Sequence, residues 1–229
     1  MKVAIMQPYF FPYIGYWQLI NMANTFVIYD DVNYIKRGFI NRNYLLQNQQ
    51  LQLFTLELIS ASQNKNINAI LIGSNTSKIL RTIKHNYTKA PHFDIVYPLI
   101  ENIFCSNEKN LSQFLGNSLE KISEFLEINT DFLYSSNINN DKSLQAQDRL
   151  IEMSQLLGTT DYINTIGGIE LYNKDDFRKA GINLSFIKTK NIEYKQYKNE
   201  FVQNLSIIDV MMFNSKQEIK QMLNEFELI

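Results

Sequence analysis

The chain has 229 residues, which is enough for one large domain but not for two of ordinary size. Its 45% hydrophobic and 20% charged residues are typical of a globular protein and not of a disordered one. With 22 basic against 23 acidic side chains, the net charge of −1 argues against general nucleic-acid binding.

The N-terminal segment predicts a βαβ unit. Residues 3–6 form a short apolar run typical of a buried strand, residues 16–23 fit a short helix, and residues 25–29 predict a second strand. This order implies a right-handed crossover between two parallel strands. Ligands of such sheets bind at the carboxyl ends of the strands, so the loops 7–15 and 30–42 are expected to open onto the same crevice.

The rest of the chain predicts further helices and strands. Apolar residues at helical spacing predict helices over residues 76–86, 94–104, 111–126, 144–157 and 216–226. Short apolar runs predict strands over residues 51–58, 132–134, 161–163 and 184–187.

Several residues predict where these helices begin and end. A Ser/Thr cap is expected before the helix over residues 76–86. Pro98 marks either the start or a kink of the helix over residues 94–104. Ser143 is expected to cap the helix over residues 144–157, and Gly158 would end this helix in a left-handed conformation. Ser215 and Glu218 form a capping box that opens the last helix, expected to run to residue 226.

Together these elements predict an α/β fold with a parallel, Rossmann-like sheet, flanking helices and a helical C-terminal portion. The polar stretch 137–142 is the predicted internal boundary. Residues 1–136 would form the α/β core with the ligand crevice. Residues 143–229 would form a C-terminal subregion, α/β to helical, packed on the same core.

The single cysteine and the N-terminus exclude further classes. Cys105 alone makes an intrachain disulfide, a CxxC redox pair and a cysteine-based zinc site impossible. The N-terminal apolar run is too short for a signal peptide, and no apolar stretch is long enough to span a membrane. We therefore expect a cytoplasmic location.

The loop after the first predicted strand is unusually aromatic. Tyrosine and tryptophan supply apolar area together with a polar tip, so this loop is either an aromatic mini-core or a stacking wall for a base or sugar ring. In the second interpretation Gly15 lets the backbone approach a ligand at the helix start. The candidate binding residues of this loop are Gln7, Tyr9, Tyr13, Gly15 and Tyr16.

The loop after the second predicted strand is rich in charged and amide side chains. Asp30 and Asp31 suit a divalent cation or hydroxyl groups, and the cations that follow suit phosphate oxygens. A solvated charged loop would look similar, but its position at the crevice favours binding. The candidate binding residues are Tyr34, Lys36, Arg37, Asn41, Arg42 and Asn43.

Two further places offer chemistry. His85, at a predicted helix end, is a candidate base near neutral pH, with a cap or surface role as the alternative. Gly167 and Gly168 follow a predicted strand and would donate backbone N–H groups to an anion, unless they form an ordinary turn. The signatures GxGxxG, GxSxG and HExxH and the P-loop are missing from the sequence.

Long blocks of the sequence resemble the WbqC-like family. Residues 6–16 (MQPYFFPYIGY) and 29–43 (YDDVNYIKRGFINRN) carry the resemblance. Shorter matches lie at residues 87–91, 161–172, 193–196 and 204–209. The family tends to have tryptophan where Phe39 stands. Because the family is met among genes for O-antigen and other surface polysaccharides, the resemblance implies a role in making or modifying an activated sugar.

A weaker similarity concerns the first βαβ unit. It looks like the start of nucleotidylyltransferases and pantothenate-synthetase-like proteins, in which an HxGH motif stabilises adenylyl transfer. Tyr13 and Tyr16 stand where the two histidines would be. A phenol donates a hydrogen bond but lacks the charge of an imidazolium, which argues against adenylyl transfer.

The resemblance implies an enzyme that tailors a nucleotide-linked amino sugar by joining an acyl or aminoacyl group, such as glycyl, to the sugar amine. Asp30 or Asp31 would bind a sugar hydroxyl, a metal or the amine, and His85 would be the base. The expected partners are the nucleotide sugar and an acyl or amino acid donor. The cofactor is unknown, with ATP and Mg²⁺ as one option, and no metal ligands are assigned. The alternatives are a non-catalytic module that binds a sugar nucleotide or a partner enzyme, and nucleotidylyl transfer to a sugar phosphate.

Overall fold

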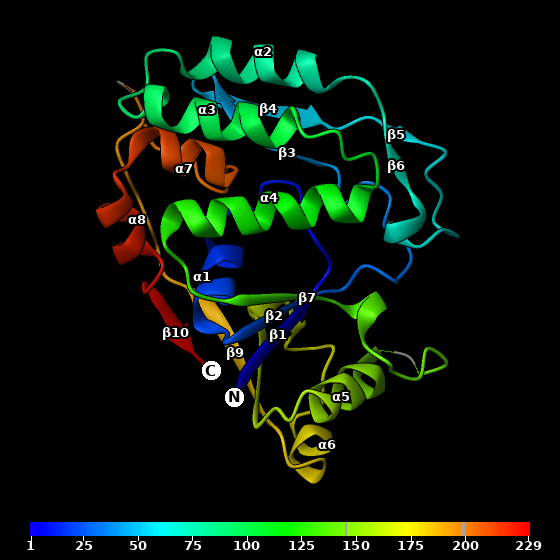
Figure 1. Ribbon diagram of the computed structural model, residues 1–229. Coiled ribbons are helices and arrows are strands. Elements are labelled where there is room, and N and C mark those ends of the chain that lie inside the picture. Colours follow the sequence, from blue (N-terminus) through cyan, green and yellow to red (C-terminus); the bar gives the residue numbers. More distant parts are fainter. Residues whose placement is uncertain (145, 198–199) are drawn as a thin grey trace.

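The computed structural model describes residues 1–144, 146–197 and 200–229 (Figure 1). Its central sheet has the order β10–β9–β8–β1–β2–β7, and all neighbours are parallel except β10 and β9. The strands are β1 (Lys2–Met6), β2 (Thr25–Ile28), β7 (Asp131–Tyr134), β8 (Asp161–Thr165), β9 (Asn183–Thr189) and β10 (Phe226–Leu228). Numbered along the chain, the parallel strands follow the doubly wound order 3-2-1-4-5.

Helices cover both faces of this sheet (Figure 1). One face carries α1 (Ile14–Met22) and α4 (Leu111–Leu126), and the other carries α5 (Ala146–Leu156) and α6 (Lys174–Lys179). Side chains of a strand alternate between faces, so Ala4 joins the larger hydrophobic cluster with α1 and α4. Val3 and Ile5 join the smaller cluster with α5 and α6. The predicted Rossmann-like α/β architecture is confirmed.

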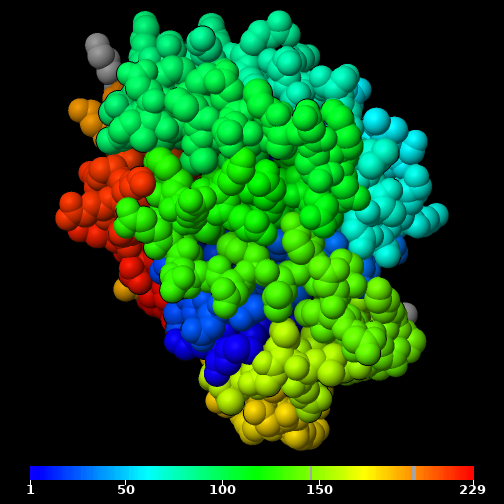
Figure 2. Space-filling view, viewed as in Figure 1, coloured from blue at the N-terminus to red at the C-terminus, as the bar shows by residue number. Residues whose placement is uncertain are grey.

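A further layer packs outside α4 (Figure 1). Its strands are β3 (Arg42–Gln47), β4 (Gln50–Thr55), β5 (Leu58–Ile59) and β6 (Leu71–Ile72). Its helices are α2 (Thr76–Tyr87), α3 (Phe93–Phe104), α7 (Ile207–Phe213) and α8 (Lys216–Met222). Short 3-10 turns are η1 (Ile67–Ala69), η2 (Ser135–Asn137) and η3 (Ile166–Gly168). Figure 2 shows the C-terminal helices, in red, against the green helices α3 and α4.

Several predicted features of the elements are confirmed. The parallel β1–α1–β2 unit is present, and α4 has the predicted bounds. Gly158 ends its helix with a φ of 65°, and Ser215 and Glu218 form the capping box. Pro98 lies inside α3, whose first residue is Phe93.

Other predicted features are wrong. The last helix ends at Met222, and residues 226–228 instead pair with β9 as an antiparallel edge strand. The cap position of α2 is Asn75, whose Oδ1 accepts a hydrogen bond from the N–H of Glu57 and not from the helix. Ser143 binds Asp141 through its N–H and hydroxyl, and α5 begins only at Ala146. Residues 226–228 and Asn75 find partners far away in the sequence, whereas Ser143 is taken up by a local turn with Asp141.

The division at residues 137–142 stays a prediction. Strands from both sides of it lie in one sheet, since β8 pairs with β1 and β7 pairs with β2.

Candidate functional site at the carboxyl edge of the sheet

The order of the parallel strands reverses between β1 and β8. In open α/β sheets, ligands bind in the crevice outside the carboxyl ends of the strands at such a switch point. Lys2 pairs with Asp161 and Val3 with Tyr162, so the ends of β1 and β8 reach the same edge. Gln7 follows one strand and the η3 turn follows the other. We take this edge as the candidate functional site.

The η3 turn presents an open backbone. Gly167 is exposed, and no atom lies within 4 Å of the place that a Cβ would take. Gly168 is packed instead, because a Cβ there would lie 2.9 Å from the ring of Tyr172. Asn164 precedes the turn and stabilises it, because its Oδ1 accepts a hydrogen bond from the Thr165 N–H at 2.7 Å. A ligand can therefore approach the backbone at Gly167.

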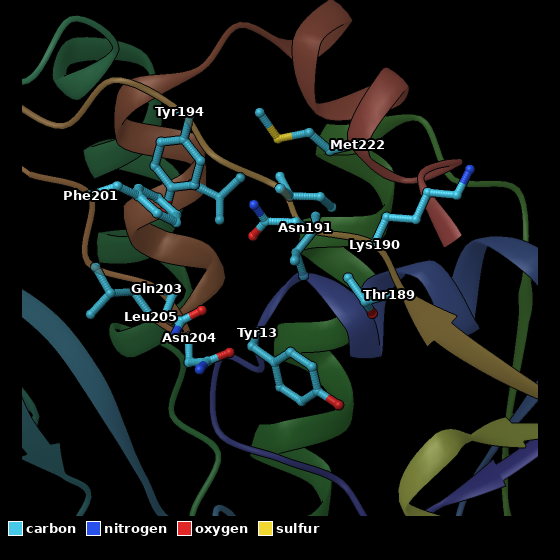
Figure 3. A pocket seen from close by; sticks show the side chains of 13 residues that line it. Tyr13, Thr189, Lys190, Asn191, Tyr194, Phe201, Gln203, Asn204, Leu205 and Met222 are labelled. Atoms are coloured by element: carbon cyan, nitrogen blue, oxygen red, sulfur yellow. The ribbon is translucent and has the colours of Figure 1, made fainter. Parts of the chain in front are cut away.

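A cavity of about 300 Å³ opens at the same edge, where β9 ends and α1 begins (Figure 3). Tyr13 is the predicted site residue that lines it. Thr189, Asn191, Phe201 and other residues of the segment 189–205 form most of its wall. Sequence reasoning missed this cavity because most of its wall comes from an irregular segment, in which no periodic pattern indicates which side chains face a common space.

A buried carboxylate lies behind this wall. Asp209 accepts hydrogen bonds from the hydroxyls of Tyr87 at 2.9 Å and Tyr194 at 2.7 Å, and from Gln196 Nε2 at 2.8 Å. Burial raises the pKa of Asp209 to about 6, although the three hydrogen bonds offset part of the rise. These residues lie in blocks that carry the family resemblance, and this was their only signal in the sequence.

The raised pKa of Asp209 predicts a pH dependence of stability. The unfolded carboxyl has a pKa of about 3.9, so the folded protein binds this proton more tightly. The resulting stabilisation is fully present below the unfolded pKa and is lost as the pH rises through the folded pKa of about 6. The variant Asp209→Asn lacks this titration.

Between pH 4 and pH 7 we expect the free energy of unfolding of the wild type to fall relative to Asp209→Asn, by about 2 kcal/mol. Urea denaturation followed by circular dichroism at several pH values measures this difference. A difference that is constant with pH would show that Asp209 titrates with its ordinary pKa.

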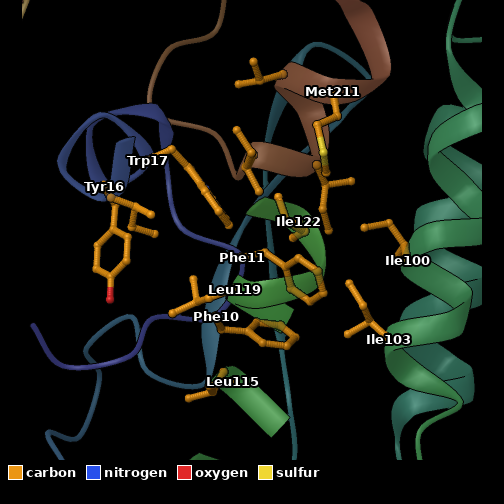
Figure 4. Close-up of a cluster of buried hydrophobic side chains, with 14 of the residues drawn as sticks. Phe10, Phe11, Tyr16, Trp17, Ile100, Ile103, Leu115, Leu119, Ile122 and Met211 are labelled. Carbon is orange, nitrogen blue, oxygen red and sulfur yellow. The ribbon is translucent and has the colours of Figure 1, made fainter. Parts of the chain in front are cut away.

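The aromatic loop after β1 is mainly a core structure. Phe10, Phe11, Tyr16 and Trp17 are fully buried. Figure 4 shows the rings of Phe10 and Phe11 among aliphatic side chains of the larger cluster, including those of α4. The mini-core interpretation therefore accounts for these four residues, while Tyr9 and Tyr13 are only partly buried.

Hydrogen bonds also fix the backbone of this loop. Asn43 donates its side-chain amide to the carbonyls of Phe10 at 3.0 Å and Phe11 at 2.8 Å. The Tyr16 hydroxyl donates to the carbonyl of Gln7 at 2.8 Å. The structure thus places Asn43 and Tyr16, both predicted to bind substrate, beneath the loop rather than at its surface.

Gly15 allows close packing of α1 against β9. A Cβ on Gly15 would lie 2.5 Å from Thr189 Oγ1 and 2.6 Å from the ring of Tyr13. We predicted that a ligand would approach the backbone of Gly15 closely, but atoms of Thr189 and Tyr13 occupy that space.

Asp30 and Asp31 lie at the end of β2, as predicted, and both are buried. Asp30 Oδ2 accepts hydrogen bonds from the hydroxyls of Ser112 at 2.9 Å and Ser136 at 3.0 Å. Asp30 Oδ1 accepts from the N–H of Ser136 at 3.1 Å. These contacts tie β2 to α4 and to the η2 turn after β7.

Asp31 forms a buried ion pair. Its Oδ2 lies 2.7 Å from Arg149 Nη2 and 3.4 Å from Lys142 Nζ, and its Oδ1 accepts from the Ser135 hydroxyl at 2.6 Å. Burial works against the charged carboxylate, but the hydrogen bonds and cations outweigh it and hold the pKa of Asp31 below its usual value. Among the described residues, no three His, Cys, Asp or Glu side chains gather in the arrangement of a metal site.

The loop between β2 and β3 stabilises itself through several predicted residues. The Tyr34 hydroxyl donates to Asn41 Oδ1 at 2.8 Å, and Asn41 Nδ2 donates to the carbonyl of Leu56 at 2.8 Å. Arg42 donates to the carbonyls of Gly38 and Arg37. Lys36 and Arg37 are exposed.

His85 lies elsewhere. It is exposed on α2 and lines a different cavity of about 490 Å³, together with Asn86, Lys89 and Tyr197. The helices α3 and α4 stand between α2 and the sheet (Figure 1). The structure therefore does not bring the three predicted catalytic residues together, since Asp30 and Asp31 lie at the sheet edge.

Within the described residues, no helix has both the length and the apolar character that crossing a membrane requires.

Comparison with protein-family models identifies one family. The model of the WbqC-like protein family matches residues 7–221, which include every loop of the carboxyl edge. A protein of Mycobacterium tuberculosis (strain ATCC 25618 / H37Rv), named "Uncharacterized protein Rv1507c", is 28% identical over 218 residues. The alignment covers 93% of each chain. No solved structure gives a significant match.

Proposed function

Because the chain belongs to the WbqC-like protein family, we propose that it binds a nucleotide-linked amino sugar at the carboxyl edge of its sheet. There it joins an acyl or aminoacyl group, such as glycyl, to the sugar amine during the synthesis of surface polysaccharide precursors. The observation that carries the proposal is the reversal of strand order between β1 and β8, since open α/β sheets bind nucleotides at that point.

The side chains at this edge suit such a ligand. The open backbone at Gly167 can approach a diphosphate. Lys36 and Arg37 supply positive charge for phosphate oxygens. The rings of Tyr9 and Phe39, whose centroids are 6.0 Å apart, offer a surface on which a base can stack.

Amide formation also requires a proton acceptor. The amine nitrogen forms a bond to the acyl carbon, the bond from that carbon to the leaving group of an activated acyl donor breaks, and the amine loses a proton. Asp30 and Asp31 already accept hydrogen bonds from protein groups, and His85 lines another cavity. This arrangement favours a second candidate function, a non-catalytic module that binds the nucleotide sugar for a partner enzyme.

The variant Gly167→Val tests the binding site. We expect it to change the free energy of unfolding by less than about 0.5 kcal/mol, because the residue is exposed and has no neighbour within 4 Å of a Cβ. We expect it to weaken the binding of a nucleotide sugar by about tenfold or more, or about 1.4 kcal/mol, because the new side chain occupies the place of the diphosphate. Isothermal titration calorimetry with UDP- and dTDP-linked amino sugars, with and without Mg²⁺, measures the change.

Asn183→Val is the matched control, because Asn183 is exposed at the opposite, amino end of β9. It should leave the affinity unchanged, and the loss of its exposed hydrogen bond to Asp161 Oδ1 at 3.3 Å should cost only about 0.5 kcal/mol. Equal affinities of the wild type and Gly167→Val would contradict a ligand site between β1 and β8.

The variant His85→Ala tests whether His85 acts as the base of the reaction. Because His85 lies at another cavity, we expect both the affinity for the nucleotide sugar and the rate of acylation to stay within a factor of about two, an energy difference within ordinary surface effects. Mass spectrometry of the nucleotide sugar after incubation with acyl donors measures the rate. A large loss of turnover with normal affinity would restore His85 as the base. Binding without any product would support the non-catalytic module.

A further inference from the structure

We propose that the cavity at the end of β9 holds the sugar ring of the nucleotide-linked ligand, an inference that rests on the proposed function. The position of the cavity is the first argument. It begins at Thr189, where β9 ends, and at Tyr13, where α1 begins. β9 is the neighbour of β8, and the η3 turn that carries Gly167 contacts β9, so the cavity and Gly167 both lie at the carboxyl edge of the sheet. A diphosphate at Gly167 would place the attached sugar toward this cavity.

The chemistry of the lining is the second argument. Asn191, Gln203 and Asn204 bring amide groups to the cavity, and amides both donate hydrogen bonds to hydroxyl groups and accept them. The rings of Tyr13 and Phe201 provide apolar faces that suit the C–H groups of a sugar. Figure 3 shows these side chains around a common space. The combination fits a pyranose better than a purely apolar group.

The charge of the lining is the third argument. No described lining residue carries a carboxylate, and the ammonium group of Lys190 points away from the centre of the cavity in Figure 3. A neutral sugar fits this environment, whereas a phosphate would find no cation directed at it. An amino group held there has no carboxylate partner in the lining, so desolvation favours its neutral, nucleophilic form.

The size and rigidity of the cavity agree with this ligand. Its volume of about 300 Å³ is at the small end of the range of ligand pockets, as expected for one sugar ring. Tyr194 is held by Asp209, and Gln196 binds both the N–H and the carbonyl of Val202 at 2.8 and 3.0 Å. The wall is therefore formed before the ligand arrives, which lowers the entropy cost of binding.

The experiment compares each nucleotide sugar with its nucleotide alone, using UDP-glucosamine against UDP and a dTDP-linked amino sugar against dTDP. In Gln203→Ala, which removes an exposed lining amide, we expect the affinity for the nucleotide sugar to fall about tenfold. The affinity for UDP or dTDP should not change. Gln217→Ala, an exposed glutamine of α8 outside the cavity, is the matched control and should change neither affinity.

A second variant keeps the test independent of any effect of Gln203 on folding. Asn204 has a φ of 61°, so Asn204→Gly removes the amide and retains the left-handed backbone. It should reproduce the selective loss. If neither variant changes the ratio of the affinity for the nucleotide sugar to the affinity for the free nucleotide, the sugar lies elsewhere. Nucleotide binding between β1 and β8 would not be affected by that result. If the wild type binds none of the four compounds, both proposals are wrong.

Discussion

Replacing Arg149 by leucine is expected to lower the free energy of unfolding by about 3 to 5 kcal/mol. Arg149 is only 4% exposed, and it is the one buried cation that contacts the Asp31 carboxylate among the described residues. Its Nε also donates to Asn140 Oδ1 at 2.8 Å, and its guanidinium lies 5.1 Å from the centre of the Tyr29 ring. Without it, Lys142 is the remaining cation at the buried Asp31, and its side chain is 61% exposed.

Urea denaturation at pH 7, followed by circular dichroism, measures this loss. The matched control is Arg178→Leu, because the pair of Arg178 with Asp175 is largely exposed and should contribute less than about 1 kcal/mol. The double variant Arg149→Leu with Asp31→Asn should recover part of the loss, since it removes the uncompensated charge. Similar costs for Arg149→Leu and Arg178→Leu would mean that the buried pair does not hold the end of β2 in place.

Replacing Phe10 by alanine is expected to lower the free energy of unfolding by about 3 to 5 kcal/mol, because the vacated space is enclosed on all sides. Phe10 is 0% exposed, and its ring centroid lies 5.0 Å from those of Phe11 and Phe54. A residue of a stacking wall would behave differently, because solvent or ligand would reach it. Thermal and urea denaturation of the variant decide between the two interpretations of the aromatic loop.

Phe39→Ala is the control for this prediction. Phe39 is 45% exposed and packs beside Tyr9 at the surface, so its loss should cost less than about 1 kcal/mol. We expect Phe39→Ala to weaken nucleotide binding and Phe10→Ala to affect it only through stability. A stable Phe10→Ala protein with reduced nucleotide affinity would instead support the stacking wall.

Local sequence was sufficient for the central elements. The βαβ unit, the helix α4 and the capping box at Ser215 were predicted because their signals act between near neighbours: apolar runs, a 3.6-residue period and a cap three residues from its partner. The edge strand β10 could not be predicted in this way. It is a strand only because β9 offers it an unpaired edge.

The sequence also indicated where the site would lie, because a βαβ unit sends its loops to the carboxyl edge of the sheet. It did not determine what each loop residue does there. Arg149 reaches Asp31 from 118 positions away, and Asn43 supports Phe10 from 33 positions away. These contacts show that Asp31 and Asn43 help to hold the fold, while their part in ligand binding stays a prediction.

The sequence by itself determined the fold class, the first parallel unit and the family. Only the tertiary structure decided that His85 lies apart from the acidic pair, and that Tyr13, the end of β9 and the segment around Gln203 share one cavity. The physical reason is that burial, charge pairing and cavity shape depend on contacts between residues far apart in the chain. A pattern read along the chain records only the neighbours of each residue.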